Sequence, residues 1–133
     1  MPSVLLWLIT AAVSAQGAPV EPAPVRQLHD AMIKPASDAI FSIAREAPKN
    51  AKAWTALVGA GGTLAKSGHL MTLQVPASNR DRWMTLSRQL TLVGRAAQRA
   101  AQTRNLEALM HASDRIMIVC ETCHAPYRNK SPR

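Results

Sequence analysis

Residues 105–128 read NLEALMHASDRIMIVCETCHAPYR, and this stretch decides the fold. Its apolar residues recur every three or four positions, which is the spacing of one face of an α-helix. Asn105 stands where an N-cap belongs, because its side chain can accept a hydrogen bond from the first helical turn. The segment predicts a long amphipathic helix with an inward stripe of Leu106, Leu109, Met110, Ser113, Ile116, Met117, Cys120, Cys123, His124 and Tyr127.

Three earlier segments have the same helical spacing and predict helices over about 25–45, 51–67 and 79–102. Pro35 should bend the first of them, whose inward stripe is Val25, Leu28, His29, Met32, Ile33, Ala36, Ile40 and Ile43. No strand alternation is visible. Four helices with short links predict an all-α fold, an antiparallel up-down-up-down four-helix bundle spanning 25–128.

The expected boundaries follow from capping and breaking residues. Asn50 is a plausible cap for the second helix, and Ser78 for the third, with Asp81 at its third position. Glycines in the second helix should weaken it, and such glycines often mark a close approach of another helix. Residues 68–77 are expected to form a connection that ends near Pro76.

The first residues look like a targeting segment. Residues 4–13, VLLWLITAAV, form an apolar run too short to span a membrane, and Val13-Ser14-Ala15 fits a small-x-small cleavage pattern. We therefore expect a signal peptide over 1–15, cleavage after Ala15 and export to the periplasm; an uncleaved anchor or an ordinary helix start is the alternative. Residues 16–24 contain three prolines and predict an extended leader, and 129–133 a flexible tail.

The chain is basic, with 16 Lys and Arg against 8 Asp and Glu and a net charge of +8. Such a charge suits nucleic acid, but an exported protein rarely meets any, and the basic residues are scattered along the helices rather than clustered. The charge therefore favours solubility or attraction to an acidic protein partner.

The chemistry concentrates in Cys120-Glu121-Thr122-Cys123-His124. On a helix Cys120, Cys123 and His124 lie at i, i+3 and i+4 and so share one face. C-x-x-C-H is the signature of covalent haem attachment: two thiols add to the haem vinyl groups, and the imidazole reaches the iron from the same side. The expected cofactor is one haem c, with His124 as the proximal iron ligand.

Other uses of the two cysteines have weaker support. A short disulfide ring is usually reactive, and a thioredoxin-type C-x-x-C is expected at the start of a helix in a βαβ context. A structural zinc site needs a fourth ligand and usually a second paired motif, which His29, His69 and His111 do not supply. No carboxylate pair, nucleophile–base pair or phosphate loop stands out, so we do not expect an enzyme.

Attachment near the C-terminus on the last of four helices resembles the class II cytochromes c, the cytochrome c-prime family with its low-spin relatives. The resemblance covers nearly all of the chain after the signal peptide. The ending Cys120-x-x-Cys123-His124-x-x-Tyr127-Arg128 is similar to that of the family. Further similarities to an exported low-spin subgroup are Trp54, Gly68-His69-Leu70-Met71 and Arg80-x-x-Trp83.

The resemblance implies a four-helix bundle with one haem c, Cys120 and Cys123 as thioether positions and His124 as proximal ligand. It also implies possible homodimers through the first helices. In the low-spin subgroup an early segment reads Met, five residues, Pro, two residues, Asp, two residues, Trp. Here the corresponding positions are His29, Pro35, Asp38 and Phe41, so the first and last depart from the pattern.

In those relatives the early methionine is the sixth iron ligand, and this chain has His29 there. Imidazole is a good iron ligand, and an inward histidine beside a haem needs a partner. Met32, one turn further on, is the alternative, and an open or water-bound position is the third; a core methionine or a hydrogen-bonded histidine is the plain structural interpretation.

The sixth ligand separates two functions. A six-coordinate haem suits one-electron transfer, whereas an open position suits binding of nitric oxide or carbon monoxide. A thiol–disulfide redox protein is a third hypothesis. Arg128 and Tyr127 are candidates for contact with the haem edge, although Arg128 can equally be a solvated tail charge. His69 and His111 are expected at the surface.

Overall fold

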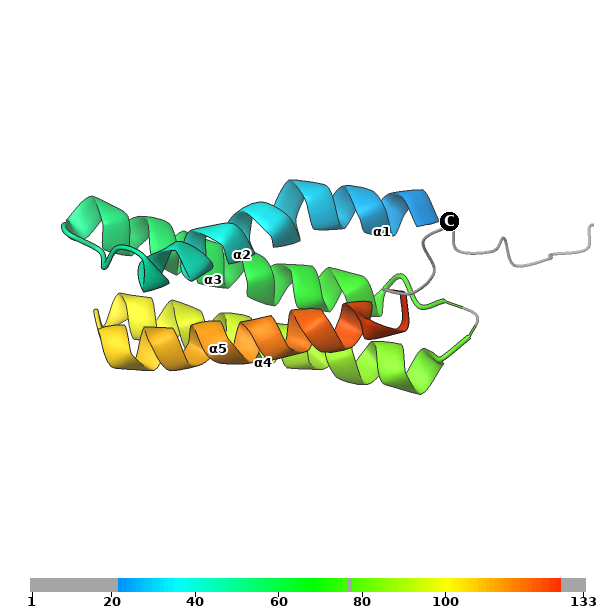
Figure 1. Cartoon of the computed structure of the whole chain (residues 1–133). Coiled ribbons are helices and arrows are strands. Elements are labelled where there is room, and N and C mark those ends of the chain that lie inside the picture. Colours follow the sequence, from blue (N-terminus) through cyan, green and yellow to red (C-terminus); the bar gives the residue numbers. More distant parts are fainter. Residues whose placement is uncertain (1–21, 77, 128–133) are drawn as a thin grey trace, which may run out of the picture.

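The computed structural model describes residues 22–76 and 78–127, and within these ranges all regular secondary structure is helical. The elements are α1 (Pro22–Leu28), the π-helical η1 (His29–Ile33), α2 (Lys34–Phe41), the 3₁₀-helical η2 (Ser42–Ala44), α3 (Ala51–Thr72), α4 (Arg80–Gln102), α5 (Leu106–His124) and the 3₁₀-helical η3 (Ala125–Tyr127). Because α1 to η2 follow one another without a break, they form one bent rod beside three straight ones (Figure 1). The predicted all-α class is confirmed.

The bend in the first rod has a local cause. Pro35 has no N–H, and its ring would crowd the carbonyl oxygen of Ala31 in a regular α-helix. The chain widens ahead of it instead: the Lys34 N–H donates to the His29 carbonyl, five residues earlier. Figure 1 shows the rod changing direction between α1 and α2. The bend expected at Pro35 therefore takes the form of a π-helical turn that begins at His29.

Two predicted boundaries of the helices were wrong. The first helix begins at Pro22 rather than at Val25, so the end of the expected leader is helical. Proline costs little in a first turn, whose N–H groups have no intrahelical partner in any case. Residues 1–21 lie outside the described residues, and so does the expected signal peptide.

The second correction concerns α3, which continues through Thr72 although 68–77 was expected to be a connection. Packing against α4 holds this extra turn: Gly68 is buried, and the Trp83 indole Nε1–H donates to the Met71 carbonyl over 2.7 Å. Tertiary contacts here outweigh the low helix propensity of glycine.

The caps are partly as expected. Asn50 accepts from the Ala53 N–H at 2.9 Å and Asn105 from the Ala108 N–H at 3.0 Å, which confirms both as N-caps. Ser78 is not the cap of α4; Asn79 takes that position in the left-handed region, with φ of 56° and no side-chain hydrogen bond. Asparagine tolerates this conformation better than serine does, which explains the one-residue shift.

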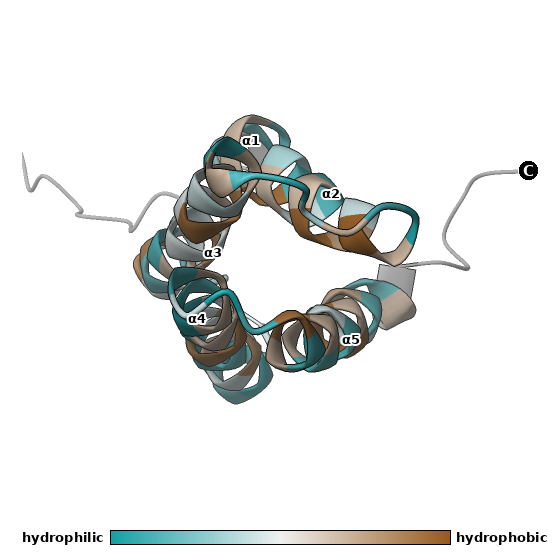
Figure 2. Ribbon diagram, turned by 90° about the vertical axis from the view of Figure 1, so that its left-hand side faces the viewer, coloured by the Kyte–Doolittle hydropathy of each residue, from teal (hydrophilic) through white to brown (hydrophobic). Residues whose placement is uncertain are grey.

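The rods surround a single apolar core. α3 packs against α2, η1 and α4, and α5 packs against α4 and α2, so the rods follow one another around the bundle (Figure 2). The largest fully buried side chains are Ile40, Leu64, Val93, Leu109 and Ile116. The described helices include none that is both long and apolar enough to cross a membrane.

The predicted inward stripe of α5 was too wide. Met110 and Met117 are 46% and 42% exposed, whereas their neighbours Leu109 and Ile116 are fully buried. Because α5 contacts only α4 and α2 to any extent, the bundle covers a narrow strip of its surface. The methionines lie one position beyond that strip.

The contact between α3 and α4 depends on glycine. A Cβ at Gly94 would lie 2.5 Å from the Ala65 nitrogen, and one at Gly61 would lie 2.5 Å from the Gln98 nitrogen. Both neighbours are backbone atoms, which cannot move without separating the helices. The two glycines therefore let α3 and α4 approach closely. Such an approach was expected of a glycine in the second predicted helix, and Gly61 is that glycine.

We expect Gly94→Ala to lower the free energy of unfolding by about 1–3 kcal/mol, because the added methyl overpacks a contact between backbones. Gly59→Ala is the matched control: nothing lies within 4 Å of its Cβ position, so it should gain up to about 1 kcal/mol from helix propensity. Urea denaturation measures both. Equal stability of the two variants would contradict the close approach.

Candidate functional site

The bundle brings together residues from opposite ends of the described chain. Cys120, Cys123 and His124 occupy the last turns of α5, and His29 is the first residue of η1. The end of α5 lies at the same end of the bundle as α1 (Figure 1). The ring centroids of His29 and His124 are 5.6 Å apart, with an interplanar angle of 43°. The two histidines expected from the sequence as iron ligands therefore lie next to each other, with their rings tilted.

This separation fits a shared metal ion. Two imidazoles that bind one first-row metal from opposite sides need centroids about 6 Å apart, since each metal–nitrogen bond is about 2.0–2.1 Å. The rings sit on helices whose other faces are buried, so their spacing is set by the packing of the rods. The side chain of His29 is 36% exposed and His124 is exposed, so both rings can be reached from solvent.

The two thiols lie on the inward side of the same helix end. Cys120 and Cys123 are half-buried, unpaired with each other, and packed against the apolar core. Burial, with smaller contributions from Cys123 and Glu121, raises the pKa of Cys120 to about 11. Burial also raises the pKa of Cys123, and the nearby Arg82 guanidinium partly offsets this.

These thiols are poorly suited to thiol–disulfide exchange. The attacking species is the thiolate, and reactive C-x-x-C pairs have a lowered pKa at a helix N-terminus. Here both cysteines lie in the last turns of α5, where the helix dipole disfavours negative charge, and both have a raised pKa. At neutral pH the thiols are therefore protonated, and they pack against the apolar core as uncharged groups.

A closed zinc site also lacks support. Within 22–76 and 78–127, His, Cys, Asp and Glu side chains form no cluster of three or more that could hold a metal ion. Structural zinc takes four such ligands. The donors that the site offers are two imidazoles with ring centroids 5.6 Å apart and two half-buried thiols on α5.

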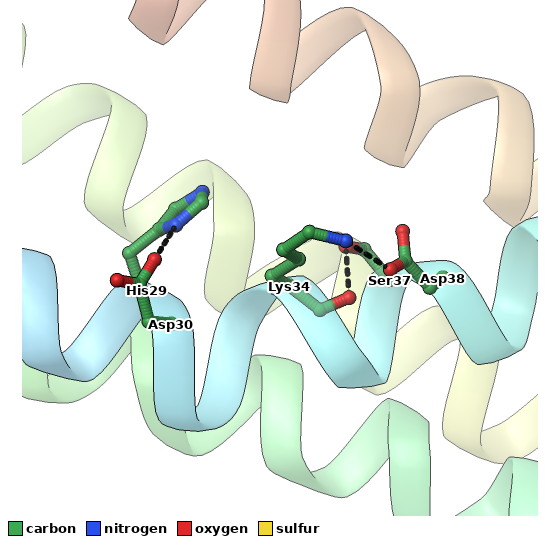
Figure 3. Close-up of polar contacts among 5 residues, drawn as sticks. All are labelled: His29, Asp30, Lys34, Ser37 and Asp38. Atoms are coloured by element: carbon green, nitrogen blue, oxygen red, sulfur yellow. Dashed lines mark hydrogen bonds and ion pairs between the residues drawn. The ribbon is translucent and has the colours of Figure 1, made fainter.

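His29 has a polar neighbour that was not predicted. Its Nδ1 lies 3.2 Å from the Oδ1 of Asp30, the next residue along the chain (Figure 3). Asp30 is 64% exposed. The only sign of this contact in the sequence was that Asp30 directly follows His29, a candidate ligand.

Arg82, at the start of α4, is the second group that sequence reasoning missed. Its guanidinium donates to the carbonyl of Thr122, which lies inside the C-x-x-C-H segment. This carbonyl is in the last turn of α5, where carbonyls have no intrahelical donor. Arg82 therefore links the C-x-x-C-H segment to α4. The contact spans 40 positions, so no local pattern could indicate it.

The remaining candidates are less informative. Met32 is half-buried on η1, as a core residue or an alternative ligand would be. His69 and His111 are exposed, as predicted, although His69 lies within α3 and not in a link. Arg128 lies outside the described residues, and Tyr127 ends η3.

Comparison of the chain with protein-family models, with curated proteins and with solved structures finds no match.

Proposed function

We propose that this chain is an exported, periplasmic c-type cytochrome with one haem c, which carries single electrons through a six-coordinate iron. The observation that carries the proposal is the adjacent pair of His29 and His124, 5.6 Å apart, directly beside the two thiols of C-x-x-C-H. A chance C-x-x-C-H would have no reason to meet a second histidine from the far end of the chain.

The fold supports the same proposal. A bundle of four helical rods, with the attachment motif on the last, is what a class II cytochrome c requires, and we propose the antiparallel up-down-up-down connection of that class. Gly61 of α3 and Gly94 of α4 let those two rods pack closely on one side of the bundle. The side between the first rod and α5 carries both histidines.

Each residue has a distinct task in this proposal. Cys120 and Cys123 would hold the haem through two thioether bonds, and His124 and His29 would serve as ligands of the iron. When bound, the haem supplies a metal centre that gains and loses one electron. Because both imidazoles are fixed to packed helices, the same ligands can serve both oxidation states with little movement.

The gas-binding alternative, a five-coordinate cytochrome c-prime, needs an empty sixth position. The ring centroids of His29 and His124 are separated by a distance close to that needed for ligation of one metal, which favours the electron carrier. Met32 is the other candidate for the sixth position.

A basic surface formed by α4 and the link after it supports the proposal of an acidic redox partner. Residues 82–106 contain five arginines and neither Asp nor Glu; the five are Arg82, Arg88, Arg95, Arg99 and Arg104, all exposed. Leu92, 53% exposed, lies on the same helix between Arg88 and Arg95. A basic surface of this kind attracts an acidic protein and accelerates encounter, an effect that salt weakens.

The optical spectrum tests the proposed function. We expect the purified protein to have a low-spin spectrum in both oxidation states, and the reduced form to be unchanged by carbon monoxide. A high-spin spectrum that shifts when carbon monoxide is added would instead favour the gas-binding protein.

A further inference from the structure

One of the two imidazole nitrogens of His29 lies beside a carboxylate. Nδ1 lies 3.2 Å from Asp30 Oδ1, and the second nitrogen is on the far side of the ring, pointing away from the helix (Figure 3). A carboxylate accepts hydrogen bonds only, so the proton of a neutral His29 belongs on Nδ1. Nε2 then presents its lone pair away from Asp30.

Such an arrangement is typical of histidines that bind metals. A ligating histidine usually donates its other N–H to a carboxylate or carbonyl group, which fixes the tautomer and ring orientation and makes the ligand more basic. Here the carboxylate comes from the neighbouring residue of the same π-helical turn. His29 and its carboxylate partner therefore both belong to η1.

We propose that Asp30 is a positioning residue, which holds His29 in the Nδ1–H tautomer with Nε2 directed to the iron and strengthens it as a ligand. This inference rests on the proposed function, because it concerns the same haem site. Asp30 does not touch the metal; it acts only through the ring of His29.

The chain offers a matched control for the charge of Asp30. Asp38 lies on α2, eight residues further along the same rod, and is similarly exposed. Its Oδ2 is paired with the Lys34 ammonium at 2.6 Å and not with a histidine (Figure 3). Asp38→Ala removes one negative charge from the rod without removing a partner of His29.

The experiment compares Asp30→Ala, Asp30→Asn and Asp38→Ala in the haem-loaded protein. Carbon monoxide competes with His29 for the iron, so a weakened His29 raises the apparent affinity for carbon monoxide. We expect a rise of about 10- to 100-fold in Asp30→Ala, the usual cost of losing an outer partner of a metal ligand. Asp30→Asn keeps an acceptor oxygen, so its affinity for carbon monoxide should rise less. The affinity of Asp38→Ala should change by less than about twofold.

A second readout follows the proton directly. Nitrogen-15 NMR of labelled full-length protein reports which nitrogen of His29 is protonated, with His29→Gln used to assign the signals. We expect Nδ1–H in the starting protein and in Asp38→Ala, and a mixture of tautomers in Asp30→Ala. The measurement is made on the full-length chain before haem is attached, because iron bound at Nε2 would by itself keep the proton on Nδ1.

The outcomes separate the two proposals. If Asp30→Ala behaves like Asp38→Ala in both readouts while His29→Ala opens the iron to carbon monoxide, Asp30 has no positioning role and the electron-carrier proposal stands. If the chain carries no haem, that proposal fails. The tautomer of His29 in Asp30→Ala then still decides whether Asp30 positions the ring.

Discussion

Replacing both Cys120 and Cys123 with alanine is expected to abolish covalent haem attachment completely. The two half-buried thiols of α5 are the chain's only cysteines, so no other side chain can form a thioether bond. A single replacement should leave one thioether, and hence haem that still stays with the denatured chain. The pyridine haemochrome spectrum of protein matured in a host that assembles c-type cytochromes measures both effects, because it responds to the number of thioether bonds.

A change elsewhere on α5 should have no such effect. Ile118 is 62% exposed and lies two residues before Cys120, so Ile118→Ala is a suitable control for general damage to this helix. We expect it to retain a full complement of haem. Retention of covalent haem in the double cysteine variant would rule out C-x-x-C-H as the attachment site.

The second large effect is expected at His29. His29→Ala removes the imidazole that lies beside His124 and should convert a low-spin, six-coordinate spectrum to a high-spin one that binds carbon monoxide. The rise in affinity for carbon monoxide should exceed about 100-fold, since removing a ligand costs more than removing its outer partner. Titration of the reduced protein with carbon monoxide, followed optically, gives the affinity.

Three further substitutions make this result specific. His29→Met should restore six ligands and raise the reduction potential, because a methionine thioether favours ferrous iron. His69→Ala removes an exposed histidine from α3 and should leave the spectrum unchanged. Met32→Ala tests the alternative ligand: if this variant opens the iron and His29→Ala does not, then Met32 is the sixth ligand.

The sequence was most informative where local chemistry decides the outcome. The spacing of apolar residues predicted the helical rods of the described residues, although not all of their ends, and Asn50 and Asn105 cap as their side chains suggest. The three functional residues of C-x-x-C-H lie at the end of one helix, as expected, and haem attachment stays a prediction. Pro35 indicated a bend, although not the π-helical form that the bend takes.

The errors and omissions arose from contacts between helices. The length of α3 depends on its contacts with α4, where Gly68 lies close to Thr91 and Trp83 donates to the Met71 carbonyl. The exposure of Met110 and Met117 depends on how little of α5 is covered. The distance between His29 and His124 is likewise a property of the assembled bundle. Sequence alone nominated His124 through the C-x-x-C-H motif and His29 through a resemblance, but it could not place them 5.6 Å apart.

The central claim is that one haem is bonded to this chain through Cys120 and Cys123. The intact mass of the denatured wild-type protein, matured in a host that assembles c-type cytochromes, tests it most directly. We expect the mass of the wild-type protein to exceed that of the bare polypeptide by one haem. The double cysteine variant should have the mass of the polypeptide alone. A colourless wild-type protein with the mass of the polypeptide alone would contradict it.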